Sequence, residues 1–204
     1  MIELPVDLPA ELVPLSWLIG FWEGSGVIDY RSDDGSVSQA EFGQRISFSH
    51  DGLPYLNYTS YTWLFPDEPG GEARPLTSET GYWRIARPLD DGDAGPGLLP
   101  PTAGHTYATA EDVERLRSPE DGGFDIEVQI VHPGSVNELY VGIVKGPRID
   151  LMTDAVIRTR SSKEYAAATR LYGLVDGHLL WAWDIAALGQ DLRTHASARL
   201  AKAD

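Results

Sequence analysis

Hydrophobic and polar residues alternate along most of this chain, as they do in β-strands that bury one face and expose the other. In FDIEVQIV (124–131) apolar residues occupy every second position, with polar residues between them. HLLWAWDI (178–185) likewise places Trp181 and Trp183 on one face. The same alternation recurs in PYLNYTSYTW (54–63), ELYVGIV (138–144) and RIDLMTD (148–154). One early stretch, VPLSWLIGFW (13–22), follows a proline-containing segment and predicts a short helix instead.

The segments between these strands carry turn-forming residues. Glycine, proline and aspartate fill the short connections HDGLP (50–54), HPGS (132–135), KGPR (145–148) and VDGH (175–178). Such short connections join antiparallel neighbours, and the Asp-Gly pair of the last one suits a type I′ hairpin. The pattern therefore predicts an all-β fold, an antiparallel up-and-down β-barrel of about ten strands with a short N-terminal helix. A lipocalin-like barrel of this size can enclose a cavity.

One stretch interrupts the strand pattern. Residues 88–123 are rich in proline, glycine and aspartate, and TAEDVERLRS (109–118) within them predicts a helical turn or two. We interpret residues 88–123 as a surface insertion between two strands of a single domain that spans residues 1–204. The alternative is that this insertion forms a lid over the mouth of the barrel.

Composition narrows the classes of function. The chain has 204 residues, a formal net charge of −15 and no cysteine. The negative charge disfavours nucleic acids and anionic membrane surfaces as partners, and the lack of thiols excludes disulfides, iron–sulfur clusters and cysteine-ligated zinc. No apolar run reaches the length of a transmembrane helix, and the acidic, proline-containing N-terminal residues do not have the pattern of a signal peptide. We therefore expect a cytoplasmic protein.

Four segments carry motifs in a fixed order along the chain. They are GFWEGSG (20–26), FSHDGLPYLNY (48–58), ETGYWR (79–84) and IAALGQDLRTHASARL (185–200). Glycines allow a strand to bend, so we expect the first motif, Gly20, Trp22, Gly24 and Gly26, to close one end of the barrel. With these four segments the chain resembles the nitrobindin family, small β-barrels similar to fatty-acid-binding proteins that hold a b-type heme. The resemblance runs from about residue 12 to residue 201, apart from the insertion.

The resemblance implies a ferric heme b protein with His195 as the metal ligand. In the family, the histidine of the closing segment is the proximal ligand of the heme iron, and that position is His195 here. A single axial imidazole leaves the sixth coordination position of the iron open. The implied function is nitric oxide binding, isomerisation of peroxynitrite to nitrate, or both, which would make the chain a peroxynitrite isomerase. Related barrels form dimers, so the implied assembly is a homodimer.

Three further positions line the heme pocket according to the resemblance: Thr77, His132 and Ile185. Thr77 stands where the family often has a distal histidine, and Ile185 where it usually has a methionine. The tyrosine-proline-threonine segment with which the family covers the heme has no counterpart in residues 28–44.

Other interpretations of the same residues stay open. Taken alone, His195 is typical of a surface histidine at a strand start, and His132 of a solvated turn. With unbroken alternation, an inward His195 would also place Arg199 inside the barrel or at its rim. The basic segment RTRSSKEYAAATRLY (158–172), with Arg158, Lys163 and Arg170, supplies either solvated charges or contacts for the propionates or carboxylate of a ligand. The alternative function is a divergent barrel that has lost heme and carries another apolar small molecule, or has no catalytic role.

Overall fold

The structure, a computed structural model, describes residues 8–31, 37–66, 68 and 70–203. Its strands are β1 (Gly20–Arg31), β2 (Val37–Ser49), β3 (Leu56–Leu64), β4 (Arg74–Ile85), β5 (Phe124–His132), β6 (Val136–Val144), β7 (Arg148–Arg158), β8 (Tyr165–Val175), β9 (His178–Ala187) and β10 (Arg193–Ala203). Its helices are the 3₁₀-helices η1 (Ala10–Leu18) and η2 (Pro96–Leu98) and the α-helix α1 (Ala110–Glu114). None of the helices in the described part of the chain is long and apolar enough to cross a membrane. The expectations about residues 1–7, and part of the stretch 28–44, lie outside the described residues.

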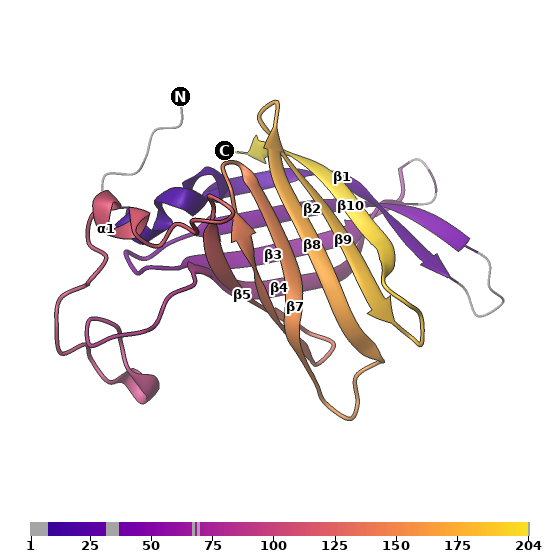
Figure 1. The fold of residues 1–204 in the computed structure, drawn as a ribbon. Helices are drawn as coiled ribbons and strands as arrows, with labels where there is room; N and C mark the ends of the chain where they lie inside the picture. Colours follow the sequence, from indigo (N-terminus) through magenta and orange to yellow (C-terminus); the bar gives the residue numbers. More distant parts are fainter. Residues whose placement is uncertain (1–7, 32–36, 67, 69, 204) are drawn as a thin grey trace.

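Each strand pairs antiparallel with its neighbours in sequence, and β1 also pairs with β10, so that the sheet closes on itself (Figure 1). This confirms the predicted antiparallel barrel of ten strands and its short N-terminal helix. The helix η1 lies at one end, which we call the closed end. We call the opposite end, where β1 ends and β10 begins, the mouth.

The glycine-tryptophan motif lies where β1 leaves the closed end. Trp22 is 2% exposed, and its Nε1 donates a hydrogen bond to the Leu18 carbonyl of η1 at 2.7 Å. Gly26 pairs with Ala198 of β10. A Cβ atom at Gly26 would lie 2.3 Å from the Ser197 carbonyl oxygen, so only glycine permits this approach of the two strands. The tryptophan thus seals the barrel against η1, and the glycines bring β1 close to β10.

Apolar side chains fill the barrel next to η1. Trp83 is fully buried there and makes edge-to-face contacts with Phe48 and Tyr172, at centroid distances of 5.4 and 5.1 Å. Burial of each such side chain contributes about 1.5–3 kcal/mol. The other large, fully buried apolar residues include Leu12, Leu15, Leu18, Ile46, Leu56 and Ile85. This packing leaves the half of the barrel near the mouth for a site.

The insertion is anchored at the closed end. Arg87, which is 7% exposed, binds both carboxylate oxygens of Glu11 at 2.7 and 2.9 Å and both of Asp93 at 2.7 and 2.8 Å. Glu11 belongs to η1, and the insertion lies beside η1 in Figure 1. The insertion leaves the barrel at the end of β4 and returns at the start of β5. The lid alternative is therefore wrong, because this end of the barrel is the one opposite the mouth.

Candidate functional site

His195 lies at the mouth, on a β-bulge of β10. Thr194 pairs with Asp184 of β9 and Ala196 pairs with Trp183, which leaves His195 as the extra residue between them. A bulge of this kind redirects a side chain and resets the alternation after it. Beyond the bulge Ala196 and Ala198 are buried, whereas Arg199 is exposed. The expectation that an inward His195 would place Arg199 inside is therefore wrong.

The His195 ring is fixed as a neutral imidazole. Its Nδ1 lies 3.0 Å from the Asp29 backbone carbonyl, which can only accept a hydrogen bond, so Nδ1 carries the proton. Burial lowers the pKa of His195 below its ordinary value of 6.5, and the Asp29 carbonyl opposes this shift in part. Within the described part of the chain, Nε2 has no hydrogen-bond partner. An imidazole whose Nδ1–H donates to a carbonyl presents the Nε2 lone pair to a metal.

Trp183 of β9 connects His195 to the interior. The two rings meet edge to face, at a centroid distance of 5.6 Å and an interplanar angle of 79°. The His132 ring lies parallel to the indole, at 5.9 Å and 10°. The Arg170 guanidinium carbon lies 4.2 Å from the centre of the same indole ring. The indole Nε1 is buried and has no hydrogen-bond partner among the described residues.

Behind Trp183 lies a group of four charged or titratable side chains, Glu79, Glu138, His132 and Arg170, which we call the buried charge cluster. Arg170 binds Glu79 through both terminal nitrogens, at 3.0 and 2.8 Å, and approaches Glu138 at 3.5 Å. The His132 Nε2 lies 2.6 Å from Glu138, and its Nδ1 lies 3.5 Å from Glu79. Charges inside a protein are tolerated when they are paired in this way.

Tyrosine hydroxyls complete the cluster. Tyr58 donates to Glu79 at 2.7 Å, and Tyr140 donates to Glu138 at 2.6 Å, as Tyr165 also does. Burial alone would raise the pKa of Glu79, but the Arg170 charge and hydrogen bonds outweigh burial and lower it to about 2. Burial would likewise raise the pKa of Glu138, but the His132 hydrogen bond and the Arg170 charge bring it below its usual value. Both carboxylates are therefore ionised at neutral pH.

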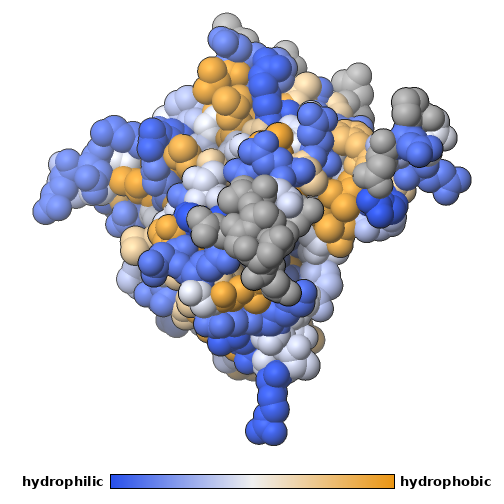
Figure 2. Space-filling model, turned by 90° about the vertical axis from the view of Figure 1, so that its right-hand side faces the viewer, coloured by the Kyte–Doolittle hydropathy of each residue, from blue (hydrophilic) through white to orange (hydrophobic). Residues whose placement is uncertain are grey.

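A small cavity of about 60 Å³ lies between the buried charge cluster and the mouth. Its wall includes Thr77, Trp183 and Ala196, the residue that follows His195. This volume holds a few water molecules, whereas a site that buries a whole drug-sized ligand needs about 300 Å³ or more. Patches of hydrophobic residues lie among hydrophilic ones at this end of the molecule (Figure 2). A large planar ligand of His195 would therefore lie in the mouth, not deep in the barrel.

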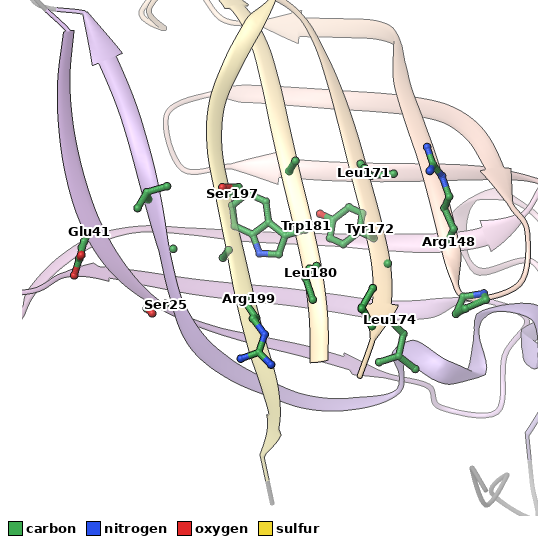
Figure 3. Close-up of a pocket in the computed structure, with 17 residues that line it drawn as sticks. Ser25, Glu41, Arg148, Leu171, Tyr172, Leu174, Leu180, Trp181, Ser197 and Arg199 are labelled. Carbon is green, nitrogen blue, oxygen red and sulfur yellow. The ribbon is translucent and has the colours of Figure 1, made fainter. Parts of the chain in front are cut away.

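A wider hollow of about 820 Å³ lies on the outer face of the barrel, over β1, β8, β9 and β10 (Figure 3). The outward side chains of Leu171, Leu180 and Arg199 line it, while the rings of Trp181 and Tyr172 point to the other side of the wall. None of the candidate residues His195, Thr77, His132 and Ile185 lines this hollow. We therefore place the candidate site at the mouth.

The structure brings some of the predicted site residues together. His195 and His132 contact the same indole of Trp183. Thr77 is exposed at the mouth, where its hydroxyl lies 3.5 Å from the Ser78 carbonyl. Ile185 is partly buried on β9 and pairs with Arg193, two residues before His195.

The buried carboxylates of Glu79 and Glu138 were not identified from the sequence, and both interpretations of Arg170 were wrong. Arg170 is neither a solvated charge nor free for the carboxylate of a ligand, because it is 4% exposed and bound to Glu79. A signal for Glu79 existed, since it shares its period-two face with Trp83 and Ile85, both of which are buried. A charged residue on an apolar face indicates a buried partner.

The chain is similar along almost its whole length to known proteins. The family described as "THAP4-like, heme-binding beta-barrel domain" matches residues 11–202. A protein named "Peroxynitrite isomerase" from Leifsonia xyli subsp. xyli is 64% identical over 204 residues, which cover the whole of both chains. Proteins of the same name from Clavibacter michiganensis subsp. michiganensis, 63% identical over all of both chains, and Kocuria rhizophila, 54% identical over 98% of this chain and 95% of that one, are also similar. The crystal structure of Rv2717c from M. tuberculosis superimposes with a TM-score of 0.66 at 26% identity, over 99% of this chain and 100% of that one.

Proposed function

Because this chain belongs to the THAP4-like heme-binding β-barrel family, we propose that it binds ferric heme b through His195 and isomerises peroxynitrite to nitrate. The observation that carries this proposal is the neutral His195 imidazole at the mouth. Its Nδ1 donates to the Asp29 carbonyl, and its Nε2 has no hydrogen-bond partner among the described residues. Relatives that are 51–64% identical to this chain carry the name peroxynitrite isomerase.

The residues at the mouth fit a heme with one protein ligand. His195 would hold the iron, and Thr77 is exposed at the mouth and lines the small cavity next to Ala196. The Asp29 carbonyl fixes the ring of His195 and makes its Nε2 more basic. The small interior cavity limits the water that can reach the site from inside the barrel.

The isomerisation of peroxynitrite requires little acid–base catalysis by the protein. Peroxynitrite and nitrate contain the same atoms and carry the same charge, so the isomerisation consumes no proton and no external electron. The heme, when bound, supplies an open coordination position at which the oxygen atoms are rearranged. The role of the chain would then be to hold the iron through His195 and to keep the mouth accessible to small ligands, and nitric oxide would bind at the same open position.

The alternative of a fatty-acid carrier has two observations against it. An interior arginine that binds a fatty-acid carboxylate must be free, but Arg170 is already bound to both oxygens of Glu79. The interior cavity of about 60 Å³ is also far smaller than the pockets of about 300 Å³ or more that bury ligands of this size.

The test is a titration of the apoprotein with hemin, followed by absorbance, and then a stopped-flow assay of peroxynitrite decay. We expect a saturable Soret band at one heme per chain, faster decay, and nitrate as the product. His195→Ala should bind no heme specifically, whereas His178→Ala should behave as wild type, because His178 lies at the closed end and faces Arg199. An unchanged Soret band in His195→Ala would show that another group holds the iron.

A further inference from the structure

We propose that Trp183 is a positioning residue for His195, and that the buried charge cluster holds Trp183 in place. This inference rests on the proposed function, because it assigns a role to the support of the proposed iron ligand. It concerns residues that touch neither the iron nor the substrate but determine how His195 presents its Nε2.

His195 needs a second support besides its hydrogen bond. The bond from Nδ1 to the Asp29 carbonyl fixes one atom of the ring but leaves the ring free to pivot about that contact. The β-bulge also removes His195 from the regular strand pairing that orients side chains elsewhere on β10. The indole of Trp183, edge to face at 5.6 Å, is the aromatic neighbour that restricts this pivoting.

Trp183 is held by its ring and not by its N–H group. Trp181, two residues before it, donates its Nε1 to the Gln44 side chain at 2.8 Å, and Trp22 donates to Leu18. The Nε1 of Trp183 has no such partner among the described residues. Its ring instead contacts the Arg170 guanidinium at 4.2 Å and the parallel ring of His132 at 5.9 Å. Tryptophan is the side chain that interacts most strongly with a cation over its face.

Arg170 and His132, which contact this indole, are themselves bound by buried carboxylates. Arg170 is bound by Glu79, and His132 is bound by Glu138 at 2.6 Å. Glu138 is 2% exposed and also accepts hydrogen bonds from Tyr140 and Tyr165. None of these charged groups is left unpaired for a ligand. Arg170 and His132 therefore form a fixed surface that orients Trp183, and Trp183 in turn orients His195.

The experiment compares Trp183→Leu with Trp183→Phe in the apoprotein and in the heme-loaded protein. In the apoprotein, ¹H–¹⁵N correlation spectra report the His195 tautomer. We expect a single tautomer with its proton on Nδ1 in wild type and in Trp183→Phe, and a tautomer mixture in Trp183→Leu. In the loaded protein, Trp183→Leu should weaken hemin binding by about 10- to 100-fold, as loss of a support of a metal ligand does. Trp183→Phe should restore most of the affinity and the wild-type iron–histidine stretching frequency in resonance Raman spectra.

Trp17→Leu is the matched control, because Trp17 is also a buried tryptophan whose Nε1 has no hydrogen-bond partner among the described residues, and it lies in η1 at the closed end. It should leave the His195 tautomer and the hemin affinity unchanged. Equal effects of Trp17→Leu and Trp183→Leu would overturn the proposal, as would a single His195 tautomer in Trp183→Leu. If Trp183→Leu does not fold, Trp183→Ile and Trp183→Met replace it, with the same expected outcome. If wild type binds no hemin, the proposed function fails, while the tautomer measurement still decides whether Trp183 positions His195.

Discussion

Arg170 and Glu79 form a bidentate ion pair inside the barrel, at 2.8 and 3.0 Å, although 91 residues separate them in sequence. Each is less than a tenth exposed. Because both charges are largely removed from bulk solvent, each depends on the other for its stability. The pair joins β4 to β8 across the interior and holds the guanidinium against Trp183.

Removing one partner of this pair should be costly. We expect Arg170→Met to lower the free energy of unfolding by about 3–5 kcal/mol, because it leaves the Glu79 carboxylate buried without its bidentate ion-pair partner. The double variant Arg170→Met with Glu79→Gln should be less destabilised than the sum of the single variants. Urea unfolding followed by tryptophan fluorescence measures both. Arg148→Met is the control, since its ion pair with Asp150 is exposed and should contribute almost nothing.

The same carboxylate makes stability depend on pH in the acid range. The pKa of Glu79 is about 2 in the folded protein and close to its ordinary 4.5 in the unfolded chain. A carboxyl group with a lowered pKa stabilises the fold above 4.5, and this stabilisation is lost as pH falls from 4.5 to 2. The loss is on the order of 3 kcal/mol for Glu79 alone, and the lowered pKa of Glu138 acts in the same direction.

Urea unfolding at pH 7, 5 and 3 tests this dependence. Wild type should lose stability mainly between pH 5 and pH 3. Glu79→Gln should be less stable than wild type at pH 7 and should show a shallower decline with acid, because it has one carboxyl fewer to protonate. Parallel declines in the two proteins would show that other groups dominate acid unfolding.

Because β1 and β10 approach closely at Gly26, we expect even a small side chain at this position to destabilise the protein. Gly26→Ala places a methyl group 2.3 Å from the Ser197 carbonyl oxygen and 2.5 Å from the Phe42 ring. Relief of this overlap requires backbone movement, so we expect a loss of about 1–3 kcal/mol of unfolding free energy. Thermal unfolding followed by circular dichroism measures it. Gly134→Ala provides the comparison, because a Cβ there meets no atom within 4 Å and should change little.

The barrel could be predicted from the sequence because the patterns that determine it extend over only a few neighbouring residues. Alternation in segments such as 124–131 and turn residues such as those of 175–178 each act within a few neighbouring positions. The bulge at His195 could not be predicted, because a register shift depends on the partner strand β9. Where the insertion lies likewise depends on a contact between Arg87 and Glu11, which are 76 residues apart. The homodimer and the cytoplasmic location stay predictions.

The buried carboxylates show what local sequence patterns cannot predict. Alternation predicts that Glu79 faces inward with Trp83, but it cannot identify what pairs with it. That partner is Arg170 on β8, and the two meet only because the closed barrel brings β4 and β8 to opposite walls of one interior. Local patterns therefore predict the wall of the barrel better than they predict the contacts across its interior.

Hemin binding should weaken in acid, at a pH that the environment of His195 sets. A protonated imidazole cannot ligate iron, so protons compete with the metal. Burial lowers the pKa of His195 below 6.5, which places the onset of this competition below that pH. We therefore expect a constant hemin affinity between pH 8 and pH 7, and a decline that approaches tenfold per pH unit below the lowered pKa. Titrations at half-unit steps, with circular dichroism to show that the barrel stays folded, measure it; an affinity that already falls between pH 8 and pH 7 would mean that a different group controls binding.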